Sequence, residues 1–127
     1  MRLIIAGSRD FNDYEFLEAQ VLAFIKRHRK NNEPVEIISG GARGADRLGE
    51  KFADRFTLTK NVVPAEWDKY GKSAGYRRNQ EMADIASHCI VLWDGKSRGT
   101  GHMLDLARQK KLVLEIVQFI PHRKETL

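Results

Sequence analysis

Residues 35–46, Val-Glu-Ile-Ile-Ser-Gly-Gly-Ala-Arg-Gly-Ala-Asp, contain the strongest pattern in the chain. The apolar residues 35–39 predict a short buried strand, and apolar positions at helical spacing predict a helix from about Ala45 to Phe56. The glycines between them permit positive φ values that turn successive backbone N–H groups toward one point, at the positive end of the helix. Arg43 adds a charge whose fork geometry suits phosphate oxygens. The stretch predicts a phosphate-binding loop at Gly40–Gly44, with a plain tight turn as the alternative.

The same alternation of strand and helix continues on both sides of this loop. Strands are expected at residues 1–7, 35–39, 57–63, 88–93 and 112–117, the third of them nearer an edge because it is more polar. Further helices are expected after an Asn12–Glu15 capping box, from Arg77–Asn79 onward, and at 102–111, with long loops at 64–75 and 94–101. Such alternation predicts a single doubly wound α/β domain, with a five-stranded, mainly parallel sheet and helices on both faces.

Length and composition fit one folded domain. The chain has 127 residues, 42% of them hydrophobic, and carries 22 Lys and Arg against 17 Asp and Glu, a net charge of +5. These values exclude a wholly disordered chain, and the basic excess makes an anionic partner plausible. We expect residues 1–120 to form the domain and residues 121–127 a polar C-terminal tail. Because no apolar run approaches the roughly 18 residues of a membrane span, we expect no membrane partner. The single cysteine, Cys89, fits a reducing compartment, so we expect a cytoplasmic location.

Several classes of site are excluded or disfavoured. The single cysteine, Cys89, excludes an intramolecular disulfide and a cysteine-based zinc site, and the histidines show no metal-ligand spacing. We therefore predict no metal and no cofactor. The motifs G-x-G-x-x-G after the first strand, G-x-x-x-x-G-K-[ST] and G-x-S-x-G are absent. Their absence argues against a classical dinucleotide-binding fold, a P-loop NTPase and a Ser-His-Asp hydrolase.

Other glycine-rich segments follow the first and fourth strands. They are Gly7-Ser8-Arg9 and Gly95-Lys96-Ser97-Arg98-Gly99-Thr100-Gly101. In open α/β sheets ligands bind outside the carboxyl ends of the strands, so these segments are expected at the same edge as Gly40–Gly44. The hydroxyls of Ser97 and Thr100 would contact a phosphate there, or else cap a helix. Gly49 alone is expected inside a helix, on its sheet-facing side.

Aromatic and basic residues complete the candidate site. Trp67 and Tyr70, with Lys72 beside them, could cover a base or ring, although Trp67 could instead plug the loop against the sheet. Arg77 and Arg78 are expected at a helix start, where cations oppose the macrodipole. This local conflict indicates a functional role, with a solvated arginine as the alternative.

Five motifs occur in one order and together resemble one family. They are Gly7-Ser8-Arg9 with Phe11, Ser39 to Asp46, Trp67 to Gly75, Arg78-Asn79 with Met82, and Asp94-Gly95 with Gly99-Thr100. In this order they resemble the YspA-type, cpYpsA-related branch of the SLOG superfamily, over about residues 2–117. The resemblance implies a Rossmann-like fold that binds nucleotides or nucleotide-derived signals. More distant relatives include the LOG phosphoribohydrolases and the single-strand-binding DprA proteins.

The comparison with the LOG enzymes also shows departures. Arg78 matches the LOG arginine, but Asn79 replaces the lysine beside it, and Met103 stands where the catalytic glutamate would be. A carboxylate elsewhere would have to substitute for that glutamate. The carboxylates expected at the ligand-binding edge of the sheet are Asp10, Asp46, Glu66 and Asp94. The catalytic candidates are Arg78 and three of these carboxylates, Asp46, Glu66 and Asp94.

Three functions remain open from the sequence. The first is binding of a phosphorylated nucleotide or nucleotide-derived signal by a sensor or sequestering protein. The second is hydrolysis of an N-glycosidic bond in such a molecule, and the third is single-stranded nucleic-acid binding. A homodimer is expected by analogy with LOG-type relatives. The predicted ligand-binding residues are Gly7, Ser8, Arg9, Gly40, Gly41, Ala42, Arg43, Gly44, Asp46, Trp67, Tyr70, Lys72, Arg78, Asn79, Gly95, Ser97, Gly99 and Thr100.

Overall fold

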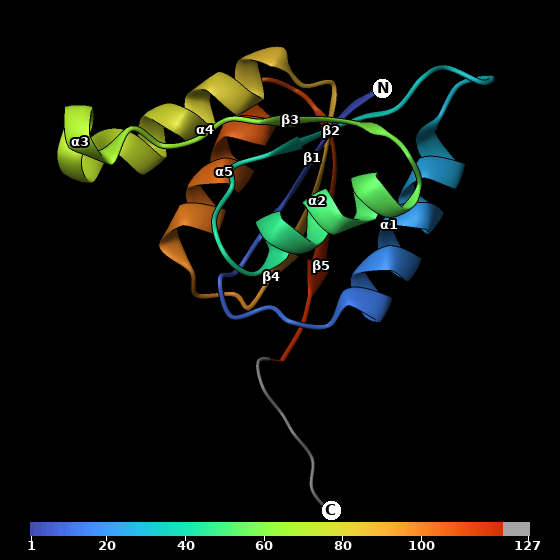
Figure 1. Ribbon diagram of the computed structural model, residues 1–127, viewed down its shortest axis with the longest axis horizontal. Coiled ribbons are helices and arrows are strands. Elements are labelled where there is room, and N and C mark those ends of the chain that lie inside the picture. The colour runs from blue at the N-terminus through green and yellow to red at the C-terminus, as the bar shows by residue number, and fades with distance from the viewer. Residues whose placement is uncertain (121–127) are drawn as a thin grey trace, which may run out of the picture.

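Five parallel strands in the order β3-β2-β1-β4-β5 form the central sheet of the computed structural model, which describes residues 1–120 (Figure 1). The strands are β1 (Arg2–Gly7), β2 (Glu36–Ser39), β3 (Thr59–Val62), β4 (His88–Trp93) and β5 (Val113–Gln118). Ile4 of β1 pairs in register with Ile38 of β2 on one side and Cys89 of β4 on the other. The predicted five-stranded α/β fold is confirmed, with every strand parallel and β3 at an edge. The expected tail, residues 121–127, lies outside the described residues.

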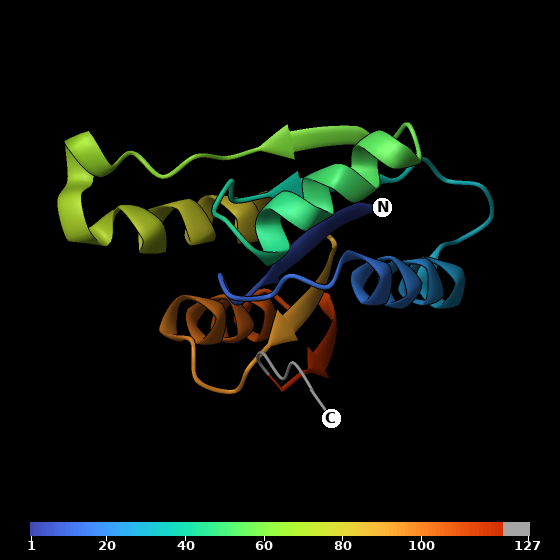
Figure 2. The same cartoon turned by 60° about the horizontal axis from the view of Figure 1, so that its bottom comes forward.

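Helices cover both faces of the sheet (Figure 2). Helices α1 (Tyr14–His28) and α2 (Ala45–Arg55) lie on one face, and α4 (Ala74–Ile85) and α5 (Arg98–Gln109) lie on the other. The short α3 (Trp67–Tyr70) and the 3-10 turn η1 (Gly71–Ser73) precede α4, at the end of an arm that extends past the sheet (Figures 1 and 2). None of the helices in residues 1–120 combines the length and apolar composition needed to cross a membrane.

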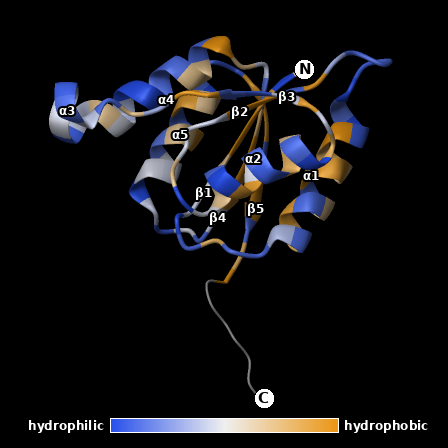
Figure 3. Cartoon of the chain, viewed as in Figure 1, coloured by the Kyte–Doolittle hydropathy of each residue, from blue (hydrophilic) through white to orange (hydrophobic). Residues whose placement is uncertain are grey.

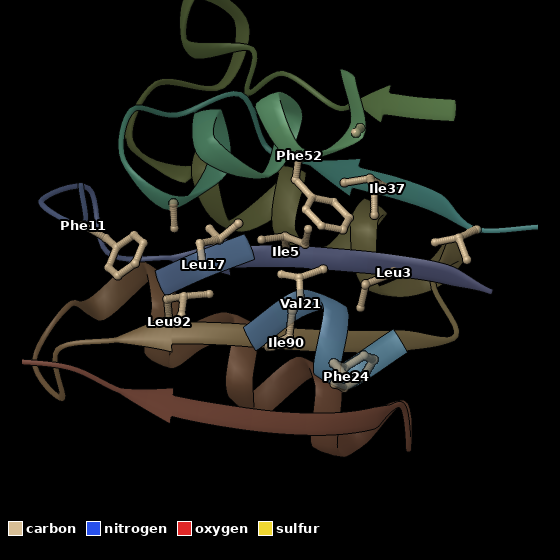
Figure 4. Close-up of a cluster of buried hydrophobic side chains, with 13 residues drawn as sticks. Leu3, Ile5, Phe11, Leu17, Val21, Phe24, Ile37, Phe52, Ile90 and Leu92 are labelled. Carbon is tan, nitrogen blue, oxygen red and sulfur yellow. The ribbon is translucent and has the colours of Figure 1, made fainter. Parts of the chain in front are cut away.

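Alternating side chains of the central strands supply two cores. Leu3 and Ile5 of β1 face α1 and α2, where they pack with Phe24 and Phe52 (Figure 4). Ile4, from the same strand, packs in the second core under α4 and α5. Because both faces are covered, the central strands need continuous apolar runs, which appear as the hydrophobic centre of the molecule in Figure 3.

A glycine allows α2 to approach the sheet closely. A Cβ added to Gly49 would lie 3.0 Å from the side chain of Ile5, which is completely buried. This confirms that Gly49 lies on the sheet-facing side of its helix. The close packing brings the start of α2 up to the carboxyl ends of β1 and β2.

The start of α1 differs by one residue from the prediction. Its N-cap is Asp13 and not Asn12, because the carboxylate of Asp13 accepts a hydrogen bond from the N–H of Phe16 at 3.1 Å. Asparagine and aspartate are equally good caps, so neighbouring candidates cannot be separated by residue type alone.

Two other helices begin earlier than predicted. The expected loop 64–75 contains α3 and η1, and α4 begins at Ala74, so Arg77 and Arg78 lie beyond its first residues. The predicted conflict between these arginines and a helix start is therefore wrong. Helix α5 begins at Arg98, so Gly99 and its neighbours form its first turn and are not a loop. Gly75 is also helical, so Gly49 is not alone in a helix.

Candidate functional site

Two cavities open where the carboxyl ends of the strands meet the starts of α2 and α5. The first, of about 580 Å³, is lined by Arg9, Gly40, Gly41, Ala42, Arg43, Arg47, Glu50, Val62, Pro64, Ala65, Trp67 and Arg78. The second, of about 370 Å³, is lined by Ala6, Gly7, Arg9, Asp10, Ala42, Arg43, Asp46, Arg78, Asn79, Met82, Ser97, Arg98, Gly99, Thr100 and Met103. The second cavity lies beyond the ends of β1 and β4, which are neighbours in the sheet. From β1 the chain adds β2 and β3 on one side of the sheet, and then β4 and β5 on the other, so the strand order reverses between β1 and β4. In open α/β sheets ligands bind at such a switch point.

Three arginines form a wall that the two cavities share. Arg9 follows β1, Arg43 follows β2, and Arg78 comes from α4. Among residues 1–120, Arg9 and Arg78 have no carboxylate within 4.0 Å of their guanidinium nitrogens, and Arg43 has only Asp10 at 3.9 Å. Both members of that pair are about three-quarters exposed (74% and 75%), so the pair neutralises little charge. The shared wall is therefore a positive region with little close ion pairing, which suits an anion.

Arg78 is held in place by its neighbours. Its Nη1 donates to the carbonyl oxygen of Gly40 at 2.6 Å, and its Nε donates to the side-chain oxygen of Asn79 at 3.0 Å. Burial lowers the pKa of Arg78 below its ordinary value, although the nearby Asp46 opposes this change. A guanidinium fixed in this way loses little conformational entropy when it binds an anion.

The loop Gly40–Gly44 has the backbone predicted for it but uses some of its N–H groups internally. Gly41 and Gly44 have φ values of +74° and +82°, which confirms the need for glycine. However, Gly41 donates its N–H to the Ser39 hydroxyl at 3.1 Å, and Ala42 donates to the Asp46 carboxylate at 3.2 Å. The expectation that successive N–H groups of the loop face a ligand is therefore wrong for Gly41 and Ala42. These hydrogen bonds hold the loop in one conformation. The contribution of the loop to anion binding is then the charge of Arg43.

Asp46 is a buried carboxyl beside the shared wall. It is 7% exposed, and a Cβ on Gly40 would lie 2.8 Å from its Oδ2 and 2.9 Å from Nη1 of Arg78. Only glycine at position 40 lets both groups occupy this space. Burial raises the pKa of Asp46 to about 6, despite the hydrogen bond from Ala42 and the charge of Arg78. A carboxyl that changes protonation near neutral pH in a cavity can exchange a proton with a ligand.

Asn79 joins Arg78 to the first turn of α5. Its oxygen accepts from Arg78, and its Nδ2 donates to the carbonyl oxygen of Gly99 at 3.3 Å and lies 3.2 Å from Nδ1 of His102. Asn79 is buried, so these contacts fix the distance between the arginine wall and α5. Met103 lines the second cavity nearby and supplies no carboxylate there.

Asp94 shapes the turn between β4 and α5. It accepts hydrogen bonds from the N–H groups of Lys96 and Ser97 at 2.9 and 2.8 Å and from the Ser97 hydroxyl at 3.0 Å. Burial alone would raise the pKa of Asp94, but these hydrogen bonds hold that pKa below its ordinary value. Ser97 occupies the N-cap position of α5 without a side-chain capping bond, so the capping alternative for its hydroxyl is wrong. The Ser8 hydroxyl also has a partner in this turn, because it accepts a hydrogen bond from the N–H of Asp94 at 3.2 Å.

Comparison with known proteins identifies the family. The family model described as "YspA, cpYpsA-related SLOG family" matches residues 1–70, which include β1, β2 and the loop Gly40–Gly44. The chain belongs to this family. It is also 31% identical over 114 residues to the Gene 61 protein of Mycobacterium phage D29, covering 85% of this chain and 89% of the phage protein. No solved structure matches. The resemblance seen in the motifs is confirmed, and membership in a SLOG family suggests a nucleotide-related function.

Most of the predicted ligand-binding residues come together at these cavities. Those that line a cavity are Gly7, Arg9, Gly40, Gly41, Ala42, Arg43, Asp46, Trp67, Arg78, Asn79, Ser97, Gly99 and Thr100, whereas Ser8, Gly44, Tyr70, Lys72 and Gly95 line neither. Among the carboxylates, Asp46 and Asp10 line the second cavity, whereas Glu66 and Asp94 line neither. Among residues 1–120, no three His, Cys, Asp or Glu side chains are arranged to hold a metal ion.

The two loop aromatics have different positions. Trp67 lines the first cavity and is 51% exposed, so the alternative that it plugs the loop against the sheet is wrong. Its ring lies over the first turn of α4, where a Cβ on Gly75 would be 3.4 Å away. Tyr70 lies outside both cavities, with the guanidinium carbon of Arg77 4.2 Å from its ring centre.

Several residues that line the two cavities were not predicted from the sequence. Arg47 and Glu50 lie in the first two turns of α2, where Arg47 donates to the carbonyl oxygen of Gly41 at 3.1 Å and Glu50 accepts from the Ser39 hydroxyl at 2.7 Å. Glu50 follows Asp46 at a spacing of four within the helix, and this helical signal could have placed Glu50 on the same side. Val62, Pro64 and Ala65 give no such signal, because β3 reaches the cavity only through its place in the sheet.

Proposed function

We propose that the protein binds a phosphorylated nucleotide or a nucleotide-derived signal, with its phosphate on the shared arginine wall. The observation that carries this proposal is the convergence of Arg9, Arg43 and Arg78 from three elements, with little carboxylate compensation. Guanidinium groups match phosphate oxygens in geometry as well as in charge. The membership in a SLOG family supports a nucleotide as the molecule that bears the phosphate.

The first cavity supplies a surface for the base. Trp67 is half-exposed and forms one side of this cavity, with Val62 and Pro64 as further apolar lining. Stacking of a base on an aromatic ring contributes about 1–3 kcal/mol and is tolerant of base identity. A nucleoside without phosphate should therefore bind, but more weakly than its phosphate.

Calorimetry with matched arginine variants tests this proposal. A nucleotide at one hundred times its dissociation constant should raise the free energy of unfolding by about 2.7 kcal/mol. Arg78→Met should weaken nucleotide binding at least tenfold, whereas Arg77→Met, an exposed arginine on the same helix outside both cavities, should bind as the wild type does. Because Arg78 also bonds to Gly40, the exposed Arg9→Ala provides a second test without that structural contact. Failure of every nucleotide to bind, or unchanged affinity in both site variants, would contradict the proposal.

Asp46 favours a second candidate, hydrolysis of the N-glycosidic bond of the bound nucleotide. Its buried carboxyl, with a pKa of about 6, lines the second cavity together with Arg78. As an acid it could protonate a departing base, and as a carboxylate it could stabilise positive charge on the sugar. Chromatography should then show free base released from nucleoside monophosphates by the wild type, with release lost and binding retained in Asp46→Asn. If substrates stay intact with the wild type, this candidate falls and binding alone remains.

A further inference from the structure

We propose that His102 is a positioning residue for the shared arginine wall, and that it holds Arg78 in place through Asn79 only while its imidazole is neutral. Protonation of His102 then weakens anion binding, although His102 lines neither cavity. This inference rests on the proposed function and adds a regulation of that site by pH. It begins from the contacts that join Arg78 of α4 to His102 of α5 through the buried side chain of Asn79.

The orientation of the Asn79 amide follows from its other partners. The Nε–H of Arg78 can only donate, so the atom 3.0 Å from it must be the amide oxygen. The carbonyl oxygen of Gly99 can only accept, so the atom 3.3 Å from it must be the Nδ2 donor. Both partners require the same orientation, in which Nδ2 also lies 3.2 Å from Nδ1 of His102 and presents a second N–H to it.

This orientation determines the protonation state of His102. Because Nδ1 accepts the N–H of Asn79, it carries no proton, and the imidazole is the neutral form with its proton on Nε2. The ring of Tyr76 lies edge-on against the imidazole, with ring centres 4.6 Å apart and an angle of 88° between the rings. This contact helps to keep Nδ1 directed at Asn79.

The surroundings of His102 favour the neutral form. The groups that face it are the amide of Asn79 and the ring of Tyr76 from α4, and the carboxylate of Asp105 from its own helix. Burial lowers the pKa of His102 below its ordinary value. Asp105 is the one charged group among residues 1–120 that shifts this pKa, and it acts more weakly in the opposite direction. His102 is therefore neutral at about pH 7 and becomes protonated in mild acid.

Protonation of His102 breaks the chain of contacts. The new proton on Nδ1 meets the N–H of Asn79, and two facing donors are relieved when the amide turns over and presents its oxygen to His102. The same turn takes that oxygen away from Nε of Arg78, which is left with its hydrogen bond to Gly40. A less fixed guanidinium loses more conformational entropy when it binds an anion, so the affinity falls.

Calorimetry of sulfate binding at several pH values tests the inference, because sulfate keeps its charge throughout the range. The matched variant is His102→Asn, whose side-chain oxygen can take the place of Nδ1, accepts the N–H of Asn79 and does not titrate. Between about pH 7.5 and about pH 5, the wild type should lose affinity about fivefold relative to His102→Asn, the equivalent of one neutral hydrogen bond. Asp46 titrates in the same range, but it is common to both proteins and cancels in the ratio.

His88→Asn is the control for loss of a histidine elsewhere. His88 begins β4 and lies 2.7 Å from the Ser87 hydroxyl, and it lines neither cavity. This variant should keep the pH profile of the wild type.

Nuclear magnetic resonance of the wild type supplies a second measurement that needs neither a ligand nor a folded variant. At neutral pH the ring of His102 should carry its proton on Nε2, and the Nε–H signal of Arg78 should move at the pH where His102 titrates. A proton on Nδ1 at neutral pH, or an Arg78 signal that does not follow the titration of His102, would overturn the inference.

Two results of the calorimetry would also overturn it and leave the proposed function intact. One is a ratio of affinities that stays constant over the pH range. The other is a wild type that gains affinity in acid relative to His102→Asn, which would show that the imidazolium attracts the anion more than the turned amide weakens its binding. If sulfate does not bind the wild type at any pH, the proposed function fails as well.

Discussion

Replacing Asp46 by asparagine should stabilise the protein increasingly as the pH rises. Burial raises the pKa of Asp46 from 3.8 to about 6 in the folded protein. Because the folded-state pKa lies above the unfolded one, the contribution of this carboxyl to stability is fully present below pH 3.8 and is lost as the pH rises through 6. A difference of this size corresponds in full to about 3 kcal/mol of unfolding free energy. Between about pH 4.5 and about pH 7.5, roughly 2 kcal/mol of this loss is expected.

Urea denaturation of the wild type and Asp46→Asn at several pH values measures this effect. The amide oxygen of asparagine can still accept the N–H of Ala42, so the loop hydrogen bond is retained. The free energy of the variant minus that of the wild type should grow by about 2 kcal/mol from about pH 4.5 to about pH 7.5. All other titrating groups are common to both proteins and largely cancel in the difference.

Asp68→Asn is the matched control, because Asp68 is an exposed carboxylate on α3 that lines neither cavity. This variant controls for the loss of one carboxylate at an exposed position outside the site. Parallel stability profiles for Asp46→Asn and the wild type would refute the reasoning, since they would show that Asp46 titrates alike in the folded and unfolded chains.

Three further predictions concern the turn at Gly44, the N-cap of α1 and the stacking of a base on Trp67. Gly44→Ala should lower the unfolding free energy by at least about 2 kcal/mol in urea denaturation, because φ is +82° and an added Cβ would lie 2.5 Å from two carbonyl oxygens; a change below about 0.5 kcal/mol would contradict this. Asp13→Ala should cost about 1 kcal/mol in the same assay and Asn12→Ala less than about 0.5 kcal/mol, and the reverse order would rule out Asp13 as the cap. Nucleotides should quench tryptophan fluorescence in Trp93→Phe but not in Trp67→Phe, and equal quenching in both would place the base away from Trp67.

The layered fold follows from patterns that are local in sequence. Residues 3–6 and 89–92 are short apolar runs because both faces of β1 and β4 are buried, and a buried strand needs no polar alternation. The loop Gly40–Gly44 is equally local, since positive φ values require particular residues at particular positions. These signals suffice to order the strands and helices along the chain.

The starts of α4 and α5 depend on contacts that the local pattern does not contain. Ala74 and Gly75 are not residue types that mark a helix start, and the ring of Trp67 lies beside Gly75 only in the folded chain. For α5, the carboxylate of Asp94 captures the N–H groups of Lys96 and Ser97 and so lets the helix begin at Arg98. The glycines after Arg98 suggested a loop, but they occupy a helical turn beside a cavity.

The candidate site was predictable where its residues directly follow a strand. Arg9 and Arg43 could be placed at the binding edge because parallel strands end on the same side. The burial of Asp46 and the hydrogen bond from Arg78 to Gly40 involve three elements, so neither follows from spacing. The division of the edge into two cavities likewise depends on where the side chain of Arg78 is held.

The burial of Asp46 opposes stability at neutral pH, and its surroundings explain how it can nevertheless contribute to the site. Its carboxylate fixes the N–H of Ala42, which is part of the wall that carries Arg43. The same carboxylate lies near Arg78 and lessens the repulsion between that arginine and Arg9 while no anion is bound. When an anion binds, it competes with the Asp46 carboxylate for these positive charges, and protonation of Asp46 relieves the resulting repulsion. Under the proposed function, a buried carboxyl with a pKa of about 6 would let three arginines converge in the free protein and still accept a phosphate, whereas a permanently charged partner in an ion pair would hinder that binding.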